Sequence, residues 1–324
     1  MYRVPLATYR LQFNSGFTFD SARRIASYLA ELGISDVYAS PILKARKGSP
    51  HGYDVVDANA LNPELGSEDD FNALHDELRR NELGLLLDVV PNHMAASAEN
   101  AWWMSVLENG PRSRFIHYFD IDANPKVLLP ILGRPYGEAL EAQEIRLGFD
   151  RDGFFFTYYE HRLPLAPESY RLILLEVVET SANLELRELV QSEEPPSNSK
   201  FLKETISRIY EQDAGFRDAL DRVIVSINGD VDRLDALLDA QWYRLAYWRL
   251  ASEKINYRRF FDVTDLVGVR VENPEVFEAR NRRTLELIAE GKVTGLRIDH
   301  IDGLYDPIGH MRKLQARVAD GWRL

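Results

Sequence analysis

Near its C-terminal end the chain carries an arginine and an aspartate two positions apart, Arg297 and Asp299 in the stretch GLRIDH (295–300). The short apolar neighbours predict a strand, in which residues i and i+2 point to the same face. There the guanidinium would hold the carboxylate ionised and oriented through charge-assisted hydrogen bonds. A carboxylate held in this way is a candidate nucleophile. For the two residues alone, a buried structural ion pair is the alternative.

Two further groups of polar residues follow predicted strands. They are His51 and Tyr53 in HGYD (51–54), and Asp88, Asn92 and His93 in DVVPNH (88–93). In a parallel βα fold the carboxyl ends of the strands meet at one edge, where the working residues lie. Aromatic rings stack on the C–H faces of sugars, whereas carboxylates, amides and imidazoles hydrogen-bond sugar hydroxyls. The residues therefore favour a neutral sugar as substrate.

Each group also has a structural interpretation. Asp88 could end its strand, Asn92 and His93 could be turn residues, and Tyr53 could be a packing residue. A metal site built from His51, His93 and Asp88 is disfavoured, because no two of these residues share the close helical spacing of typical ligand pairs. We therefore expect neither a metal nor another cofactor.

Strand-like and helix-like segments alternate at both ends of the chain. The predicted strands are residues 7–13, 34–39, 84–90 and 294–299, and the predicted helices are 20–32, 67–80, 274–290 and 307–319. The fold class expected is therefore α/β, namely the first four βα units of a TIM-type (β/α)8 barrel. A four-stranded, doubly wound open sheet is the alternative, although no GxGxxG or phosphate-binding loop supports its nucleotide-binding form.

The alternation stops between the third strand and the third helix. We expect three segments: 1–93 as the first part of the barrel, 94–273 as a large, mixed and mainly helical insertion, and 274–324 as the continuation. Within the insertion, the sequence predicts a hairpin at 150–159, a flexible polar run at 191–200, and helices at 201–227 and 231–253. Aromatic residues of the insertion, such as Trp103 and Tyr243, could form a lid over the site or its own core.

Composition excludes several classes of partner. A formal net charge of −12 argues against nucleic acid and anionic membranes as partners. The absence of cysteine rules out disulfides. The first residues, MYRVPLATYRLQF, lack the apolar core of a signal peptide, so we expect a cytoplasmic location.

The motifs HGYDVVD, DVVPNH and GLRIDH, in this order, resemble the α-amylase superfamily, glycoside hydrolase family 13. Longer segments are similar to one branch of it, the (1→4)-α-D-glucan 1-α-D-glucosylmutases. These segments are ATYRLQF, YASPILKARKGSPHGYDVVD, VPNHMAASAENAWWMSVLENGP, INYRRFFDVTDLVGVRVE and TGLRIDHIDGL. They are spread over essentially the whole chain, and INYRRFFD is more specific than the general motifs.

The resemblance implies an isomerase that transfers glucose within one maltooligosaccharide. Asp299 would attack the penultimate glucose at the reducing end and form a covalent glucosyl-enzyme. The released glucose would turn and attack through its own anomeric hydroxyl, giving maltooligosyl trehalose. By the same resemblance, Arg297 would orient Asp299, and Asp88 would support the site. His51, His93 and Asn92 would bind the sugar, and Tyr53 would stack beneath it. No role follows for the segment RRFF (258–261).

The family's acid/base glutamate belongs after a fifth strand, and no glutamate follows Asp299. We therefore expect an N-terminal part of a longer enzyme, inactive alone, whose missing half could be supplied in trans by a second polypeptide or by dimerisation. Another α-glucan hydrolase or transglycosylase of family 13 and a non-catalytic maltooligosaccharide-binding remnant are the alternatives.

Overall fold

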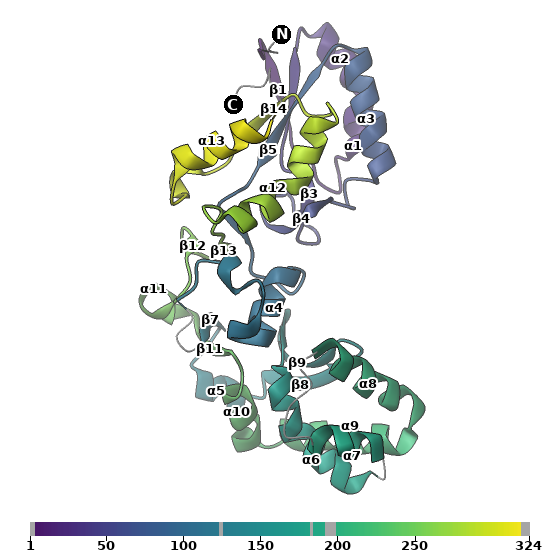
Figure 1. The fold of residues 1–324 in the computed structure, drawn as a ribbon, viewed down its shortest axis with the longest axis vertical. Helices are drawn as coiled ribbons and strands as arrows, with labels where there is room; N and C mark the ends of the chain where they lie inside the picture. Colours follow the sequence, from purple (N-terminus) through teal and green to yellow (C-terminus); the bar gives the residue numbers. More distant parts are fainter. Residues whose placement is uncertain (1–3, 123–125, 182–183, 192–198, 319–324) are drawn as a thin grey trace. The chain divides into compact units, whose positions relative to one another are not determined.

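The computed structural model describes residues 4–122, 126–181, 184–191 and 199–318 (Figure 1). It divides into two compact units, each described by itself below. Unit 1 comprises Met1–Ala101, His117–Asp120 and Arg258–Leu324, and unit 2 comprises Trp102–Ile116 and Ile121–Tyr257. Unit 2 falls inside the predicted insertion, whose bounds of 94 and 273 stay a prediction. Most of the predicted flexible run lies outside the described residues.

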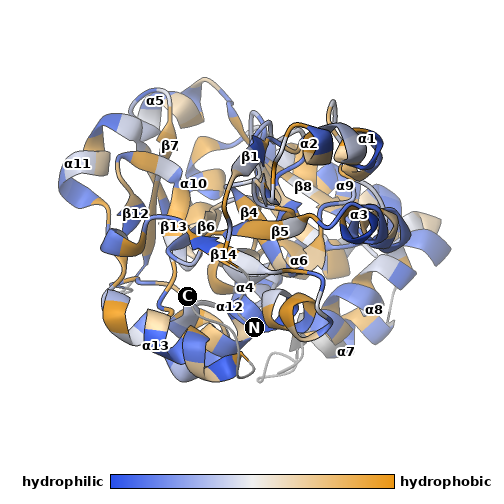
Figure 2. Cartoon of the chain, turned by 90° about the horizontal axis from the view of Figure 1, so that it is seen from above, coloured by the Kyte–Doolittle hydropathy of each residue, from blue (hydrophilic) through white to orange (hydrophobic). Residues whose placement is uncertain are grey.

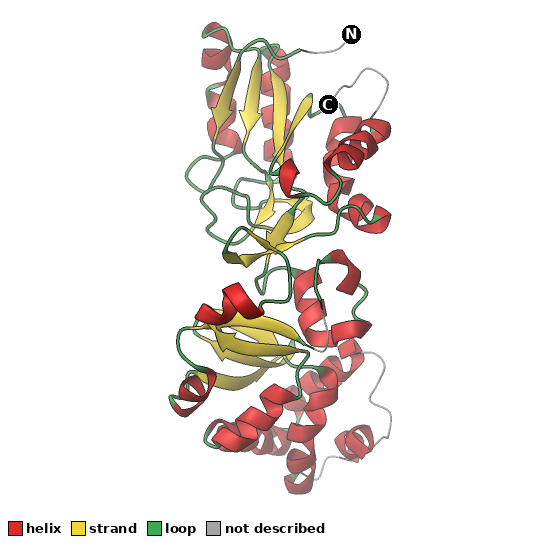
Figure 3. Cartoon of the chain, turned by 90° about the vertical axis from the view of Figure 1, so that its left-hand side faces the viewer, coloured by secondary structure: helices red, strands yellow, loops and turns green. Residues whose placement is uncertain are grey.

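Four parallel strands form the main sheet of unit 1 (Figure 3). They are β1 (Thr8–Leu11), β2 (Asp36–Ala39), β5 (Gly84–Val89) and β14 (Gly295–Ile298), in the order β1-β2-β5-β14. This order follows the chain without the reversal that marks a doubly wound sheet. The four predicted strands are confirmed, whereas their closure into a barrel stays a prediction.

The register of these strands decides which side chains become neighbours. Tyr38 lies between Arg10 of β1 and Leu86 of β5, and Arg297 of β14 pairs with Asp88. Residues more than two hundred positions apart in the sequence thus meet at one level of the sheet.

Five helices accompany this sheet in the described part of unit 1. They are α1 (Phe19–Arg24), α2 (Ala26–Glu31), α3 (Glu68–Arg80), α12 (Pro274–Ala289) and α13 (Pro307–Arg317). The single helix predicted over 20–32 is interrupted at Ile25, whose φ of −105° and ψ of 3° leave helical geometry. Helix α3 begins at a capping box between Ser67 and Asp70, at the predicted start of the helix over 67–80.

Shorter strands extend unit 1 beyond the main sheet. They are β3 (Leu43–Ala45) paired with β4 (Val55–Leu61), and the three-stranded set β12 (Arg259–Phe260), β13 (Val263–Gly268) and β6 (His93–Ala95). The 3₁₀ turns are Ile116–Tyr118 and Ile301–Gly303. Strand β13 lies between β12 and β6, and the ring of Phe260 in the RRFF segment lies 4.2 Å from that of His93.

The core of unit 1 lies between the sheet and its helices. The rings of Phe13, Phe19 and Phe71 pack edge to face or tilted, with centroids 5.3 to 5.6 Å apart. Strand β5 contributes Leu85 and Leu87, both buried. Figure 2 shows the contrast between the hydrophobic β5 and the hydrophilic helix α3. Burial of this strand on both faces explains its nearly continuous apolar sequence.

Unit 2 combines helices with two small sheets. The helices are α4 (Ala101–Asn109), α5 (Tyr136–Glu141), α6 (Arg171–Thr180), α7 (Leu184–Gln191), α8 (Ser199–Gln212), α9 (Ala214–Asn228), α10 (Val231–Asp239) and α11 (Ala251–Lys254), with 3₁₀ turns Gly110–Arg112, Pro167–Tyr170 and Trp248–Leu250. The strands are β7 (Val127–Leu132), β8 (Ile145–Asp150), β9 (Gly153–Tyr158), β10 (His161–Pro164) and β11 (Tyr243–Tyr247). Strands β10, β9 and β8 are antiparallel, which confirms a hairpin near 150–159.

The helix predicted over 231–253 is wrong beyond Asp239. The chain leaves α10 there and forms β11, which pairs in parallel with β7. Tyr243 and Leu245 alternate with the exposed Arg244, a period of two that suits a strand. Tyr243 and Trp103 are buried in unit 2, so for these two residues the core interpretation holds. No helix among the described residues is long and apolar enough to cross a membrane.

Candidate active site

Asp88, at the end of β5, is the centre of the polar network in unit 1. Its side chain is 0% exposed. One carboxylate oxygen, Oδ2, accepts hydrogen bonds from the hydroxyls of Tyr38 and Tyr53, each at 2.6 Å. The other, Oδ1, accepts one from Nη1 of Arg297 at 3.0 Å. Donors from three separate segments thus replace the water that a buried carboxylate loses.

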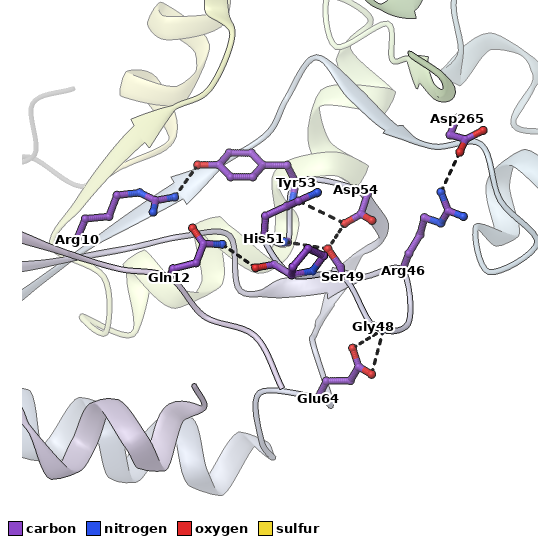
Figure 4. A network of polar contacts seen from close by, with 12 residues as sticks. Arg10, Gln12, Arg46, Gly48, Ser49, His51, Tyr53, Asp54, Glu64 and Asp265 are labelled. Carbon is purple, nitrogen blue, oxygen red and sulfur yellow. Dashed lines mark hydrogen bonds and ion pairs between the residues drawn. The ribbon is translucent and has the colours of Figure 1, made fainter. Parts of the chain in front are cut away.

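The two tyrosines stay protonated and so remain donors. Burial and then the hydrogen bond to Asp88 raise the pKa of both the Tyr38 and the Tyr53 hydroxyl. The Tyr53 oxygen also accepts a hydrogen bond from Nη2 of Arg10 at 3.3 Å (Figure 4). Tyr53, the residue predicted to stack on a sugar, is therefore held at its tip from two sides.

Arg297 connects Asp88 to Asp299. Its Nη1 also donates to Oδ1 of Asp299, which confirms that the two side chains share one face. Burial alone would lower the pKa of Arg297, but the hydrogen bonds to Asp88 and Asp299 outweigh it and raise that pKa. The Asp299 side chain is 15% exposed, so a small molecule can reach it. An oriented, accessible carboxylate beside a permanent cation has the properties of a nucleophile.

His93 is buried and packs on the RRFF segment. Its ring lies 4.2 Å from that of Phe260. Burial, and then the nearby charge of Arg280, lowers the pKa of His93 to about 3. The imidazole is therefore neutral at ordinary pH and could accept one hydrogen bond and donate another to a ligand.

Arg258 connects several segments of this region through hydrogen bonds and an ion pair. Its Nη1 donates to Oδ1 of Asn92 at 2.5 Å, its Nη2 donates to the Val269 carbonyl at 2.9 Å, and its Nε pairs with Asp120 at 3.1 Å. Asn92 is itself buried. Arg258 already donates a hydrogen bond to the amide oxygen of Asn92. The contact of Asn92 with substrate stays a prediction.

His51 lies on the exposed side of the HGYD turn (Figure 4). Its Nδ1 accepts a hydrogen bond from the Tyr53 amide at 3.0 Å, and the two rings are 5.8 Å apart. Gly52 adopts a φ of 79°, and a Cβ there would lie 2.5 Å from the carbonyl oxygen of Pro41. Only glycine fits this turn, which fixes where His51 and Tyr53 project. The described residues contain no group of three potential metal ligands.

The loop after β14 is also built in an unusual conformation. His300 and Phe261 both have left-handed backbones, with φ of 47° and 50°, and their rings lie 4.9 Å apart. Such a conformation costs roughly 1–2 kcal/mol for a residue other than glycine. The structure therefore holds two strained aromatic residues here: His300, which follows Asp299 in the sequence, and Phe261, which packs on the His300 ring.

Direct contacts join Tyr53, Asp88, Arg297 and Asp299, four of the residues predicted from the sequence. His51 joins through the Tyr53 ring. The roles of Tyr38, Arg10, Arg258 and Phe260 were not predicted from the sequence. For Tyr38 and Arg10 the available signal was the expected pairing of β1 with β2. Arg258 and Phe260 depend on pairing between segments far apart in the sequence.

The pKa of His93 leads to a prediction about stability. Between pH 6.5 and about 3 the imidazole takes up a proton in the unfolded chain but not in the folded one. Stability therefore falls as the pH decreases through this window, by at most about 1.4 kcal/mol per pH unit. The positive charge of Arg280 and the neighbouring His300 and Arg258 oppose protonation in the same direction.

When the pH is lowered from 7 to about 5, the free energy of unfolding should decrease in both proteins. We expect the decrease to be about 2 kcal/mol smaller in the variant His93→Gln than in the parent. Urea unfolding at each pH measures the difference. His310, whose pKa burial lowers to about 4, contributes a similar dependence that both proteins share. Parallel pH profiles in parent and variant would show that His93 is not buried as described.

The family described as "Alpha amylase, catalytic domain" matches residues 24–137. Among curated proteins, a putative maltooligosyl trehalose synthase of Mycobacterium tuberculosis H37Rv is 32% identical over 320 residues, which cover 96% of this chain and 33% of the relative.

Solved structures agree with this relation. A glycosyltrehalose synthase, DSM5389, is 34% identical with a TM-score of 0.74, and the match covers 97% of this chain and 36% of that protein. Maltooligosyltrehalose synthase from Arthrobacter ramosus is 33% identical with a TM-score of 0.71, over 97% and 33% of the two chains. The chain is thus similar to the N-terminal part of maltooligosyl trehalose synthases in the α-amylase family, and it spans about a third of their length.

Proposed function

We propose that this chain carries the nucleophile side of a (1→4)-α-D-glucan 1-α-D-glucosylmutase, which converts the reducing end of a maltooligosaccharide into maltooligosyl trehalose. The observation that carries the proposal is the guanidinium of Arg297, which bridges the buried Asp88 and the accessible Asp299. The relation to maltooligosyl trehalose synthases supports the choice of substrate and reaction.

In the first step, the carboxylate of Asp299 attacks C1 of the penultimate glucose. A bond forms between C1 and the carboxylate oxygen, the bond from C1 to the glycosidic oxygen of the terminal glucose breaks with inversion, and that oxygen takes a proton from a general acid. In the second step the anomeric oxygen of that released glucose attacks C1, the bond between C1 and the carboxylate breaks, and the hydroxyl proton returns to the general acid/base group. Two inversions retain the α configuration and give an α,α-1,1 linkage.

Other residues bind and orient the sugar in this proposal. Tyr53 stacks beneath the ring that reacts, and its position is set by Asp88 and Arg10. His93 and His51 hydrogen-bond the hydroxyls, together with Asn92. Asp88 itself acts as a positioning residue, since its oxygens already accept hydrogen bonds from three side chains.

We further propose that the described residues do not supply the proton donor for the leaving group. Asp88 is committed to its three donors, and Asp302 is 83% exposed and paired with His300. General acid assistance is worth about 10²- to 10⁴-fold in rate. The whole activity then requires a further group, from a completed barrel or from a partner polypeptide.

The cytoplasmic location stays a prediction.

A glycosyl donor whose leaving group needs no proton tests the nucleophile separately from the general acid. With α-maltotriosyl fluoride the C1–F bond breaks and fluoride leaves unprotonated, so we expect a burst on the order of one fluoride per chain. Mass spectrometry should locate the sugar on the peptide that contains Asp299. Maltopentaose should react at most very slowly, because its leaving group needs a proton.

Addition of glucose as acceptor distinguishes the three candidate functions. A non-reducing product supports the glucosylmutase, and a gain of reducing ends would favour an α-glucan hydrolase instead. Binding of maltopentaose without any fluoride burst would indicate a non-catalytic remnant and would overturn the proposal.

A further inference from the structure

A polar hollow in unit 2 is separate from the candidate active site. It has a volume of about 180 Å³ and lies between the start of α5, the end of α10, strand β11 and the residue that precedes β7. The polar side chains that line it are Lys126, Tyr136, Asp235, Asp239 and Arg244. All belong to unit 2. No role in the proposed reaction falls to any of them.

The polar groups of the hollow are held in place by one another. The hydroxyl of Tyr136 donates to Oδ1 of Asp235 at 2.6 Å. Burial and then this hydrogen bond raise the pKa of Tyr136, so the hydroxyl keeps its proton. Nζ of Lys126 donates to Oδ1 of Asp239 at 2.9 Å and also to its carbonyl, at the last residue of α10. A cation is favoured at this end of a helix.

The wall behind these groups is part of the rigid core of unit 2. Tyr243 and Arg244 pair with Val127 and Leu128 across the β11–β7 ladder. Tyr243 is buried, and its hydroxyl donates to the carbonyl of Pro164 at 3.1 Å. The hollow therefore exists before any ligand arrives, and a ligand would not have to order its walls.

Charge and size define the class of ligand. Two cations, Lys126 and Arg244, face two carboxylates, Asp235 and Asp239, so the lining is formally neutral. Any anion or cation would meet a like charge in this small space, whereas hydroxyl groups can donate to the carboxylates and accept from the cations. The volume lies below the ~300 Å³ at which pockets for drug-sized ligands begin, and it suits one sugar ring rather than a chain.

We propose that unit 2 holds a second, non-catalytic sugar pocket, which binds one glucosyl unit of an α-glucan between Tyr136, Asp235 and Arg244. The choice of glucose rests on the proposed function, but binding here does not depend on the chemistry at Asp299. A second contact of this kind would keep a long glucan attached while its reducing end reacts elsewhere, because a tethered end has a high effective concentration.

The test is a titration of the full 324-residue chain, labelled with nitrogen-15, with maltose. We expect saturable shifts of the Tyr136 and Arg244 amide resonances, with a dissociation constant on the order of 1 mM. The double variant Asp235→Asn, Arg244→Gln should weaken this binding about tenfold or more, since it removes charge-assisted hydrogen bonds. Both residues are exposed, so the variant should fold, and its spectrum shows whether it does.

Two controls separate this pocket from the active site. Asp232→Asn changes an exposed carboxylate on the same helix that does not line the hollow, and it should leave the affinity unchanged. Asp299→Asn should also leave it unchanged, although it abolishes the fluoride burst. The proposal is overturned if maltose does not shift these resonances, if the double variant binds as well as the parent, or if phosphate binds here in place of maltose.

Discussion

Replacement of Asp299 by asparagine should abolish the fluoride burst from α-maltotriosyl fluoride, with a loss on the order of 10⁴-fold in rate. The amide keeps the size of the side chain and can still bond Arg297, but it has no negative charge and cannot form a stable bond to C1. Fluoride leaves without a proton, so the measurement depends on the nucleophile alone. A fluoride electrode and the mass of the Asp299 peptide measure the two consequences.

Asp302→Asn is the matched control for this variant. It changes an aspartate three residues away that is mostly exposed and faces His300 instead of Arg297. We expect it to keep the burst within about twofold, because a screened surface charge contributes little. If Asp302→Asn were as damaging as Asp299→Asn, the loop after β14 rather than one carboxylate would be responsible, and the assignment of the nucleophile would fail.

The four strands of the main sheet of unit 1 could be predicted from the sequence because each carries a local signal, whereas the short strands β3, β4, β6, β12 and β13 were not predicted. Strand β5 is continuously apolar, and α3 and α12 begin at recognisable caps, Ser67 and Asn273. The order of the four strands followed from the βα alternation, because consecutive strands of such a fold lie side by side. Closure of the sheet into a barrel depends on long-range strand pairing, which local sequence patterns do not predict. Closure therefore stays a prediction.

Unit 2 was predicted less well because its signals conflict. The residues around Tyr243 have the composition of a helix that continues α10, and only pairing with β7 makes them a strand. This pairing joins residues more than a hundred positions apart. Single-sequence periodicity cannot detect such a partner, and the alternation of buried and exposed residues is too short to decide.

Within the site, the sequence identified groups but not their connections. Arg297 and Asp299 could be paired from parity alone, since two residues in one strand determine the outcome. Tyr38 could not, because its function depends on the level at which β2 meets β5 and on the direction of Tyr53, which the Gly52 turn sets. The hydrogen bonds of Asp88 are therefore a property of the tertiary fold, and they can be tested through stability.

Asp88→Ala should lower the free energy of unfolding of unit 1 by about 3 kcal/mol. The variant leaves the hydroxyls of Tyr38 and Tyr53 without their acceptor in a partly buried place, and each such loss costs about 1–3 kcal/mol. Arg297 adds little to this cost, because its side chain is 46% exposed and water can solvate it again. Urea unfolding followed by circular dichroism measures the transition.

A double-mutant cycle shows whether the cost arises from the network or from the cavity. Tyr38→Phe alone should cost about 1 kcal/mol, and it should cost much less in the Asp88→Ala background, where its hydroxyl has already lost the acceptor. A pure cavity effect would instead make the two losses additive. Because Arg297 also needs Asp88 to orient Asp299, Asp88→Ala should slow the fluoride burst, whereas Tyr38→Phe should change stability more than rate. Equal effects of both variants on the burst would contradict the arrangement in which Asp88 acts on the nucleophile through Arg297.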